Sequence, residues 1–206
     1  MTARLRQMVS WVRRCLAAAG LAVVCLGAGG VAAEEFLAGQ MLVSVPEMRD
    51  PNFGRTVVYM LRHDERGALG LVINRPLGEV PLTLLLEGKD SDWSGSERVM
   101  VHSGGPVGPE RLISLHSRDL MPGSSHVVSD ELAYTDGQEV LMAIRDGKGP
   151  KRWLFALGYS GWGAGQLESE LERGDWFVVP GDLSILFEED HDKRWEAAVA
   201  LYTPEL

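Results

Sequence analysis

The sequence predicts an α+β fold, a single compact domain with a mostly antiparallel or mixed sheet and flanking helices. The first apolar runs come as neighbouring strands joined by a short turn, whereas later runs alternate with segments of helical periodicity. No internal repeat and no long linker divides the chain after residue 33. Neighbouring strands joined by short turns pair antiparallel, so a doubly wound parallel sheet is not expected.

The N-terminal segment has the layout of a secretory signal peptide. Four arginines lie in residues 1–14, and an uncharged stretch rich in Ala, Gly, Val and Leu follows from Cys15 to Ala33. We expect cleavage after Ala33, which leaves residues 34–206 as the domain. The pair Arg13-Arg14 also admits the twin-arginine export route. An uncleaved membrane anchor is the alternative, because a membrane helix needs about 20 apolar residues.

The composition of the segment 34–206 argues against several classes of function. Its 16 basic and 29 acidic residues give a net charge of −13, because the four arginines of the signal are removed. Such a charge repels nucleic acid and anionic lipid. Both cysteines lie in the signal, so we expect no disulfide, thiol nucleophile or cysteine metal site. We therefore expect a periplasmic or secreted protein without nucleic-acid partners or stable membrane insertion.

The N-terminal half of the domain reads as strands. The apolar run Gly39–Val45 predicts a first strand, and residues 47–55 carry turn residues. Residues 56–63 and 67–74 predict a β-hairpin in which Gly67 supplies a positive φ. Both hairpin strands are almost continuously apolar, so we expect them to be buried on both faces.

The middle of the chain predicts a short helix and two further strands. Pro81–Glu87 reads as a helix with proline in its first turn, ended by Gly88. Residues 88–97 are a polar loop. Residues 98–117 predict a strand, a glycine turn and a second strand.

A capped helix and a strand follow. Thr135 and Gln138 have the spacing of a capping box, and Asp146-Gly147 predicts the end of that helix. Residues 153–157 predict a buried strand.

The C-terminal part predicts two helices around a last strand. We expect a helix over Ala164–Arg173, stopped by Gly174, and a strand over 176–180. The final helix carries its apolar residues along one stripe: Trp195, Ala198, Val199 and Tyr202.

The glycine-rich segment 156–171 raises the question of phosphate binding. A phosphate-binding P-loop needs Lys and Ser or Thr after its last glycine, and here Gln166-Leu167 follow instead. No Lys or Arg occurs from Leu157 to Leu171. We therefore interpret the glycines as turn and packing residues, and expect no cofactor.

Catalytic and metal patterns are weak. Neighbouring His102 and Ser103 point to opposite faces of a strand, and Ser160 does not fit the nucleophile elbow. A hydrolase that uses His102 or His63 as general base is kept as an alternative. The histidines share no metal-binding spacing, and His191 lies among acids that read as a helix start, so no metal site is expected.

Three blocks of the sequence resemble the bacterial YqgE/AlgH family. They are FLAGQMLVSVPEMRDPNFGRTVVYMLRHDERGALGLVINRP, then HSGGPV, then LGYSGWGAGQLESELERGDWFVVP, and they span essentially the whole domain. The resemblance implies a single α+β domain built round a bulged sheet, with no agreed catalytic activity. Some members are named as regulators of alginate production or transcription. The family generally lacks an export signal, so a cytosolic transcriptional regulator is a further alternative.

The family motifs supply the candidate binding residues. Among the motif residues, we expect polar contacts with a ligand only from Asp50, Asn74, Arg75 and Gln166. Our hypothesis is a non-enzymatic protein in which the motif turns converge on one shallow pocket for a small ligand or a partner chain. Arg75 would give charge selectivity, Trp162 an apolar wall and Gln166 hydrogen bonds, with Gly104 and Gly105 in the neighbouring turn. The full set of motif positions is Asp50, Pro51, Phe53, Asn74, Arg75, Pro76, Gly104, Gly105, Pro106, Gly158, Tyr159, Gly161, Trp162, Gly165 and Gln166.

Overall fold

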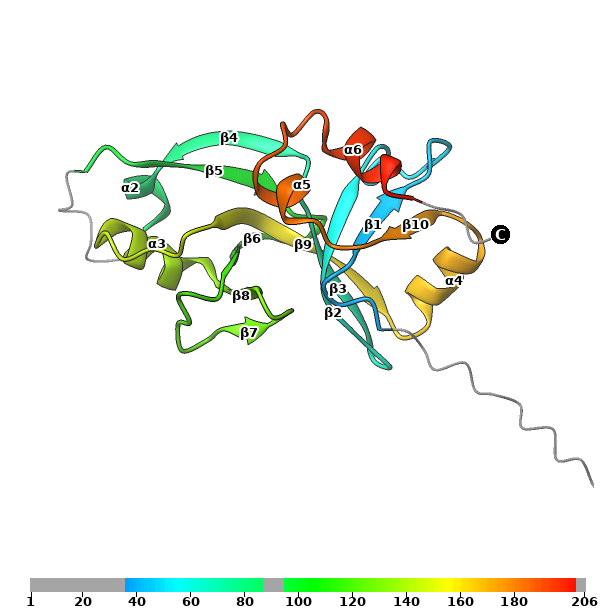
Figure 1. The fold of residues 1–206 in the computed structure, drawn as a ribbon, viewed down its shortest axis with the longest axis horizontal. Coiled ribbons are helices and arrows are strands. Elements are labelled where there is room, and N and C mark those ends of the chain that lie inside the picture. Colours follow the sequence, from blue (N-terminus) through cyan, green and yellow to red (C-terminus); the bar gives the residue numbers. More distant parts are fainter. Residues whose placement is uncertain (1–35, 87–94, 203–206) are drawn as a thin grey trace, which may run out of the picture. The chain divides into compact units, whose positions relative to one another are not determined.

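A curled, mainly antiparallel sheet dominates the computed structural model, which describes residues 36–86 and 95–202 (Figure 1). Across it the described strands run in the order β10-β1-β2-β3-β9-β6-β8-β7, and β4 joins through β5, which pairs with β9. The β5–β9 pairing is parallel; every other pairing of the described strands is antiparallel. The strands are β1 (Met41–Ser44), β2 (Val57–Asp64), β3 (Gly67–Val72), β4 (Pro76–Pro81), β5 (Arg98–Ser103), β6 (Val107–Ser117), β7 (His126–Val127), β8 (Leu132–Asp136), β9 (Trp153–Gly163) and β10 (Trp176–Val179).

The described residues belong to one compact unit, Glu35–Leu206. The expected signal segment 1–33, the helix stop at Gly88 and most of the polar loop 88–97 lie outside the described residues. The prediction of an α+β domain is confirmed in its coarse form, with the sheet as the larger component.

The predicted hairpin forms as β2 and β3. Gly67 has φ +128°, a conformation that favours glycine, and the register slips at a bulge between Met60 and Arg62. Alternate residues of β2 enter different cores, because Tyr59 packs on one face of the sheet and Val58 on the other. The expectation that this hairpin is buried on both faces is confirmed.

Strand β9 belongs to both halves of the sheet. Its first part lies between β5 and β6, and its last residues, Ser160–Gly163, pair with β3. We predicted a strand only over 153–157, followed by a glycine turn, and this was wrong. The glycines continue the strand, and Gly158, with φ +71°, lies within it.

Three short strands escaped the sequence analysis, and one cap was assigned to the wrong residue. Strands β4, β7 and β8 contain few consecutive apolar residues, and β4 begins and ends with proline. The helix after β8 is capped by Asp136, whose side chain accepts a hydrogen bond from the Gln138 N–H at 3.0 Å. Thr135 is instead the penultimate residue of β8.

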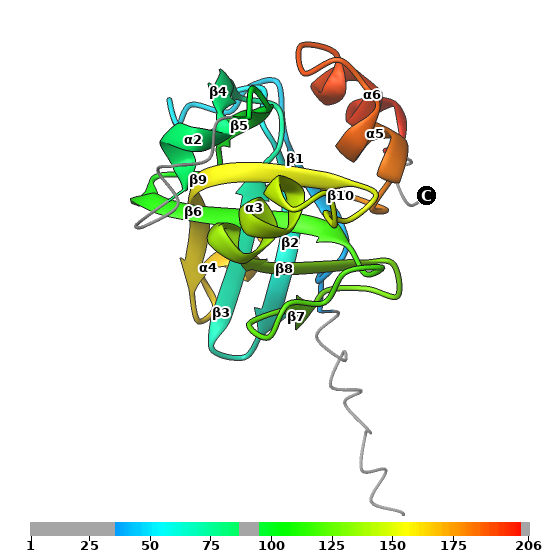
Figure 2. The ribbon, with the colours of Figure 1, turned by 90° about the vertical axis from the view of Figure 1, so that its left-hand side faces the viewer.

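Short helices cover the sheet (Figure 2). Helix α3 packs on β6 and β8, α4 on β3, β9 and β10, and α6 on β1 and β2. Among the described helices, none combines the length and the apolar character needed to cross a membrane. The helices are α2 (Leu82–Leu85), α3 (Gly137–Arg145), α4 (Gln166–Glu172), α5 (Leu183–Phe187) and α6 (Arg194–Ala200).

Three apolar clusters hold these layers together. One lies between the sheet and the C-terminal helices α5 and α6, where Leu186 and Ala198 are fully buried. A second lies under α4, around Leu167, and a third joins α2 and α3 to β5 and β9, around Phe155. The helices therefore bury their apolar faces against three different parts of the same curled sheet.

Candidate functional site

The glycine turn between β5 and β6 crosses β9 at very short range. A Cβ atom at Gly104 would lie 2.3 Å from the Gly158 carbonyl oxygen, and one at Gly105 would lie 2.3 Å from the Tyr159 carbonyl carbon. The Gly104 N–H donates to the Leu157 carbonyl at 2.8 Å. The two predicted site residues Gly104 and Gly105 thus form a backbone crossing, and they line neither of the two hollows described below.

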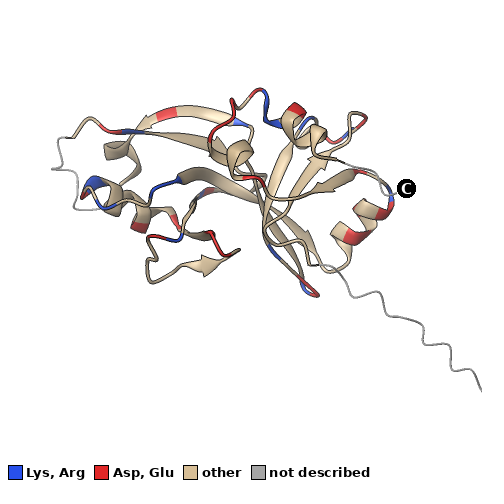
Figure 3. Ribbon diagram, in the orientation of Figure 1, with Lys and Arg blue, Asp and Glu red and all other residues tan. Residues whose placement is uncertain are grey.

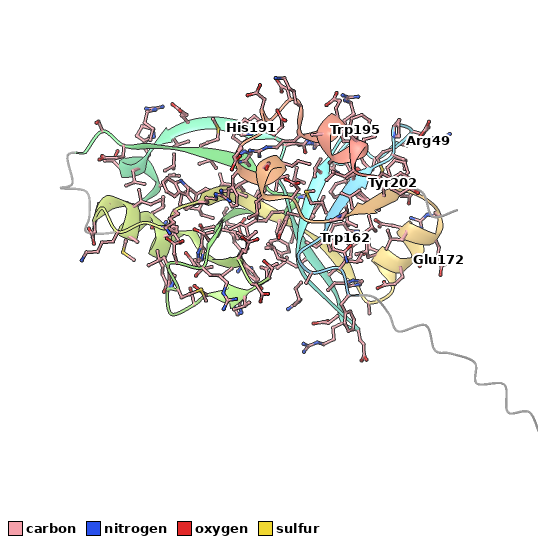
Figure 4. The ribbon with its side chains drawn as sticks, viewed as in Figure 1. Arg49, Trp162, Glu172, His191, Trp195 and Tyr202 are labelled. Carbon is pink, nitrogen blue, oxygen red and sulfur yellow. The ribbon has the colours of Figure 1, made fainter. Side chains whose placement is uncertain are left out.

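Three of the predicted motif stretches, those around Asp50, Pro106 and Trp162, contribute residues to one surface groove of about 840 Å³. The loop after β1 forms one side, and the end of β9 with helix α4 forms the other. Figure 4 labels Trp162 on β9 and Arg49 on that loop. We call this site the aromatic groove and define it by Asp50, Phe53, Trp162, Gln166, Glu170 and Trp176.

Glu170 organises the floor of the aromatic groove. Its Oε2 accepts hydrogen bonds from the indole N–H groups of Trp162, at 2.8 Å, and Trp176, at 2.9 Å. Its Oε1 accepts from the Gln166 amide at 3.0 Å. Gln166 in turn accepts from the Gly163 N–H at 3.1 Å. This network fixes both indoles before any ligand arrives.

The loop 45–55 covers the tryptophans. The centre of the Phe53 ring lies 5.4 Å from the centre of the Trp176 ring, in an edge contact, and 6.4 Å from the centre of the Trp162 ring. Asp50 shapes the loop, because its side chain accepts from the Asn52 N–H at 2.7 Å and its carbonyl accepts from the Phe53 N–H at 3.0 Å. The predicted turn chemistry of this segment is confirmed.

Asn74 and Arg75 support this loop from behind. The Asn74 side chain accepts from the Val57 N–H at 2.9 Å and donates to the Arg55 carbonyl at 2.8 Å. Arg75 donates to the Gly54 carbonyl at 3.2 Å and to the Thr56 hydroxyl at 2.9 Å. Burial lowers the pKa of Arg75, and Asp50 acts against that shift. Neither Asn74 nor Arg75 is among the residues that line the groove.

His63 ties β2 to α4. Its Nδ1 accepts from the Leu37 N–H at 3.2 Å, so its Nε2 carries the proton and donates to Glu168 at 2.6 Å. Burial acts to raise the pKa of Glu168, but hydrogen bonds from its own backbone N–H and from His63 outweigh burial and lower it. An acid therefore lies beside His63, as a general base would require, but both ring nitrogens are already engaged.

His102 lies in a second polar cluster, under the C-terminal segment. Its Nδ1 donates to the Phe155 carbonyl at 3.2 Å, so its Nε2 accepts from His191 Nδ1, also at 3.2 Å. Burial, with contributions from His191 and Arg194, lowers the pKa of His102 to about 4 against the opposing Phe155 hydrogen bond. Arg194 is buried and donates to the Ile73 carbonyl. Figure 4 labels His191 on this segment.

These contacts bear on the alternative chemistries. The hydrolase interpretation requires a histidine that faces a cleft, and neither His63 nor His102 lines the two hollows. Within residues 36–86 and 95–202, no group of three or more His, Cys, Asp or Glu side chains has the arrangement of a metal site.

A second hollow, of about 850 Å³, lies on the other side of Gly161 and Trp162. It opens within the curl of the sheet, between the β2–β3 hairpin and the strands β6 and β8. We call it the polar hollow and define it by Arg62, Arg111, His126, Tyr134, Tyr159 and Trp162.

Sequence reasoning found part of the groove and, of the polar hollow, only the motif residues Tyr159, Gly161 and Trp162 on β9. Asp50, Trp162 and Gln166 were predicted and do line the aromatic groove. Glu170 and Trp176 were missed, although the turn at Gly174 that brings them together was predicted. Arg111 was missed because a single arginine on a strand carries no motif.

Comparison with known proteins agrees with this architecture. Residues 41–206 match the AlgH-like family model. A UPF0301 protein of Methylococcus capsulatus is 41% identical over 169 residues, covering 81% of this chain and 89% of the relative. A UPF0301 protein of Burkholderia vietnamiensis is 44% identical over 169 residues, with 80% and 88% covered.

Two solved structures are similar. The solution structure of the AlgH protein from Pseudomonas aeruginosa has a TM-score of 0.68 at 38% identity, covering 84% of this chain and 92% of that one. The crystal structure of protein DIP2367 from Corynebacterium diphtheriae has a TM-score of 0.64 at 19% identity, covering 81% and 87%, and shows the fold alone. The chain belongs to the AlgH-like family, the YqgE/AlgH family of bacterial proteins.

Proposed function

We propose that this protein is a non-enzymatic binding protein whose aromatic groove takes a positively charged, partly apolar segment of a partner chain. The observation that carries the proposal is the convergence of three separate motif stretches, at Asp50, at Pro106 and at Trp162–Gln166, on one groove whose floor is already ordered.

Charge supports a cationic occupant. The groove is lined by four acids, against two arginines. Arg173 and Asp175 are paired with each other at 2.7 Å, which leaves three acids against Arg49. Figure 3 shows acidic residues along α4, the helix that carries Glu170. A lysine or arginine of a partner would meet both carboxylates and aromatic rings here. The four acids are Glu47, Asp50, Glu170 and Asp175.

The shape of the groove supports a chain segment. Its rim residues Glu47, Arg49, Asn52 and Gln166 are exposed, while Trp162 and Trp176 form a buried floor. A bound segment would keep one side in water and press its apolar side chains against Phe53. Because Glu170 already holds the two indoles in place, binding would order few additional side chains.

Selection from a peptide display library on the purified protein tests this proposal. We expect enrichment of peptides that combine Lys or Arg with aromatic or aliphatic residues. Their Kd should rise about tenfold or more in Phe53→Ala and by a smaller factor in Asp50→Asn. Glu172→Gln, on the exposed side of the same helix, is the matched control and should leave the Kd unchanged. Selected peptides that bind Phe53→Ala as well as the wild type would refute the groove as the site.

We also propose that the protein acts outside the cytoplasm. The arginine-rich start, the uncharged stretch and the small-residue cleavage pattern support export. Fractionation of the native host with mass spectrometry of the N-terminus tests it. A periplasmic protein that begins at Glu34 supports export, whereas a cytosolic protein with intact Met1 contradicts it and favours a cytosolic regulator.

A further inference from the structure

The polar hollow has the parts of a ligand site that is separate from the aromatic groove. Arg62 enters it from β2 and Arg111 from β6, so the two cations come from strands on different walls of the curl. Its volume of about 850 Å³ lies within the range usual for sites that hold small molecules.

Arg111 has no ionic partner among residues 36–86 and 95–202. Its guanidinium is exposed and lies 5.8 Å from the centre of the Tyr159 ring, and no carboxylate of the described residues lies within ion-pair distance. Several other arginines form ion pairs, for example Arg152 with Glu188 at 3.3 Å. Arg62 has only a long contact, 3.7 Å, with Asp64.

Two acids also line the hollow, and they limit what it accepts. Asp136 caps α3, where its carboxylate accepts from the Gln138 N–H and faces the positive end of the helix. Glu110 is exposed next to Arg111 in sequence. The single unpaired guanidinium therefore suits one carboxylate of a ligand better than a polyanion.

Aromatic rings provide the rest of the surface. His126 and Tyr134 stack at 5.0 Å with an interplanar angle of 25°, and Tyr159 lies beneath Arg111. Apolar side chains of Leu69 and Ile113 also reach the hollow. A flat ring can pack on these faces while a carboxylate attached to it forms two parallel hydrogen bonds with Arg111.

We propose that the polar hollow binds a small aromatic carboxylate, with Arg111 pairing with the carboxylate and the rings of Tyr134 and Tyr159 contacting the aromatic part. This site is independent of the proposed peptide site, although the two hollows share Gly161 and Trp162.

Calorimetric titration of the purified protein with 2-naphthoate tests the proposal. We expect saturable binding of one molecule per chain, and binding of the neutral 2-naphthamide weaker by about tenfold or more. Cyclohexanecarboxylate, which keeps the charge but lacks a flat ring, should also bind more weakly. Equal binding of naphthoate and naphthamide, or no saturable binding of naphthoate, would overturn the proposal.

Substitutions of Arg111 test whether naphthoate binds in the polar hollow. Arg111→Gln should weaken naphthoate binding about tenfold or more, and Arg111→Lys should fall between it and the wild type, because lysine keeps the charge but not the two-pronged geometry. Arg49→Gln, in the aromatic groove, is the matched control and should bind as the wild type does. Unchanged binding in Arg111→Gln would overturn the proposal. Phe53→Ala should lose peptides and keep naphthoate, so the two proposals can fail separately.

Discussion

The aromatic groove and the polar hollow lie on either side of Trp162, and they differ in whether their main charged side chain already has partners. In the groove, the Glu170 carboxylate accepts three side-chain hydrogen bonds. In the hollow, Arg111 has a ring contact and no ionic partner among the described residues. A satisfied charge fixes the shape of a site, whereas an unpaired one is available to a ligand. One strand thus supports two sites that are built on different principles.

The largest expected effect comes from displacing β9, the strand whose Gly161 and Trp162 line both sites. Gly105→Ala should lower the free energy of unfolding by about 3 kcal/mol or more, because the added Cβ meets the Tyr159 backbone and φ is +147°. Both binding activities should be lost together. Urea denaturation measures the loss, and Gly123→Ala, with open space around it, is the control. A stable Gly105→Ala protein would show that β9 can shift.

Acid should destabilise the buried polar cluster around His102, in which both ring nitrogens of His102 already have hydrogen-bond partners. The folded pKa of His102 is about 4, below its ordinary value of 6.5, so the unfolded chain binds a proton that the folded chain does not. Stability is therefore complete above pH 6.5 and falls by about 3 kcal/mol as the pH drops toward 4.

Urea denaturation across this pH range checks the expectation about His102. His102→Asn should flatten the decline, and His126→Asn, an exposed histidine on β7, should not. Equal slopes in the wild type and His102→Asn would rule out His102 as the source of the decline.

A smaller effect should separate the groove from the hollow. Glu170→Ala removes the acceptor of two indole N–H groups and should cost about 2 kcal/mol of unfolding free energy. Peptide binding should weaken, and naphthoate binding should persist. Glu172→Ala on the same helix is the matched control. If both variants cost the same, Glu170 does not organise the groove.

The smallest effect should come from Arg111. Arg111→Gln should change the free energy of unfolding by less than about 0.5 kcal/mol, because an exposed guanidinium with one ring contact contributes little to stability. Thermal denaturation measures it, with Arg152→Gln as a comparison that loses an exposed ion pair. A large loss in Arg111→Gln would make this arginine a structural residue.

The sequence predicted the elements that depend on local patterning. The hairpin around Gly67 and the strand 176–180 follow from apolar runs and turn residues, and the structure contains both. The continuation of β9 through Gly158–Gly163 could not be predicted in this way. The backbone of Gly104 and Gly105 passes very close to this stretch of β9. This is a tertiary contact, which local patterning does not reveal.

The candidate site, like the fold, could be predicted where a local motif marks its residues and not where tertiary contacts decide. Asp50, Trp162 and Gln166 could be proposed because they lie in glycine- and proline-rich motifs, and they meet at one groove. We expected Arg75 to face a ligand, but its guanidinium donates hydrogen bonds to the Gly54 carbonyl and the Thr56 hydroxyl. Whether a polar side chain is free or engaged depends on the backbone groups that folding brings to it, and the sequence does not display these.

The path of β9 through both halves of the sheet has a consequence for dissecting the molecule. The strands β5 and β6 pair with the first stretch of β9, and β3 pairs with its last residues. A cut at Gly158 would leave most of the stretch that pairs with β5 and β6 in one fragment and the stretch that pairs with β3 in the other, so reassembly would require both pieces to be present. Residues Trp153–Gly163 are for this reason a poor place to insert a tag or a second protein.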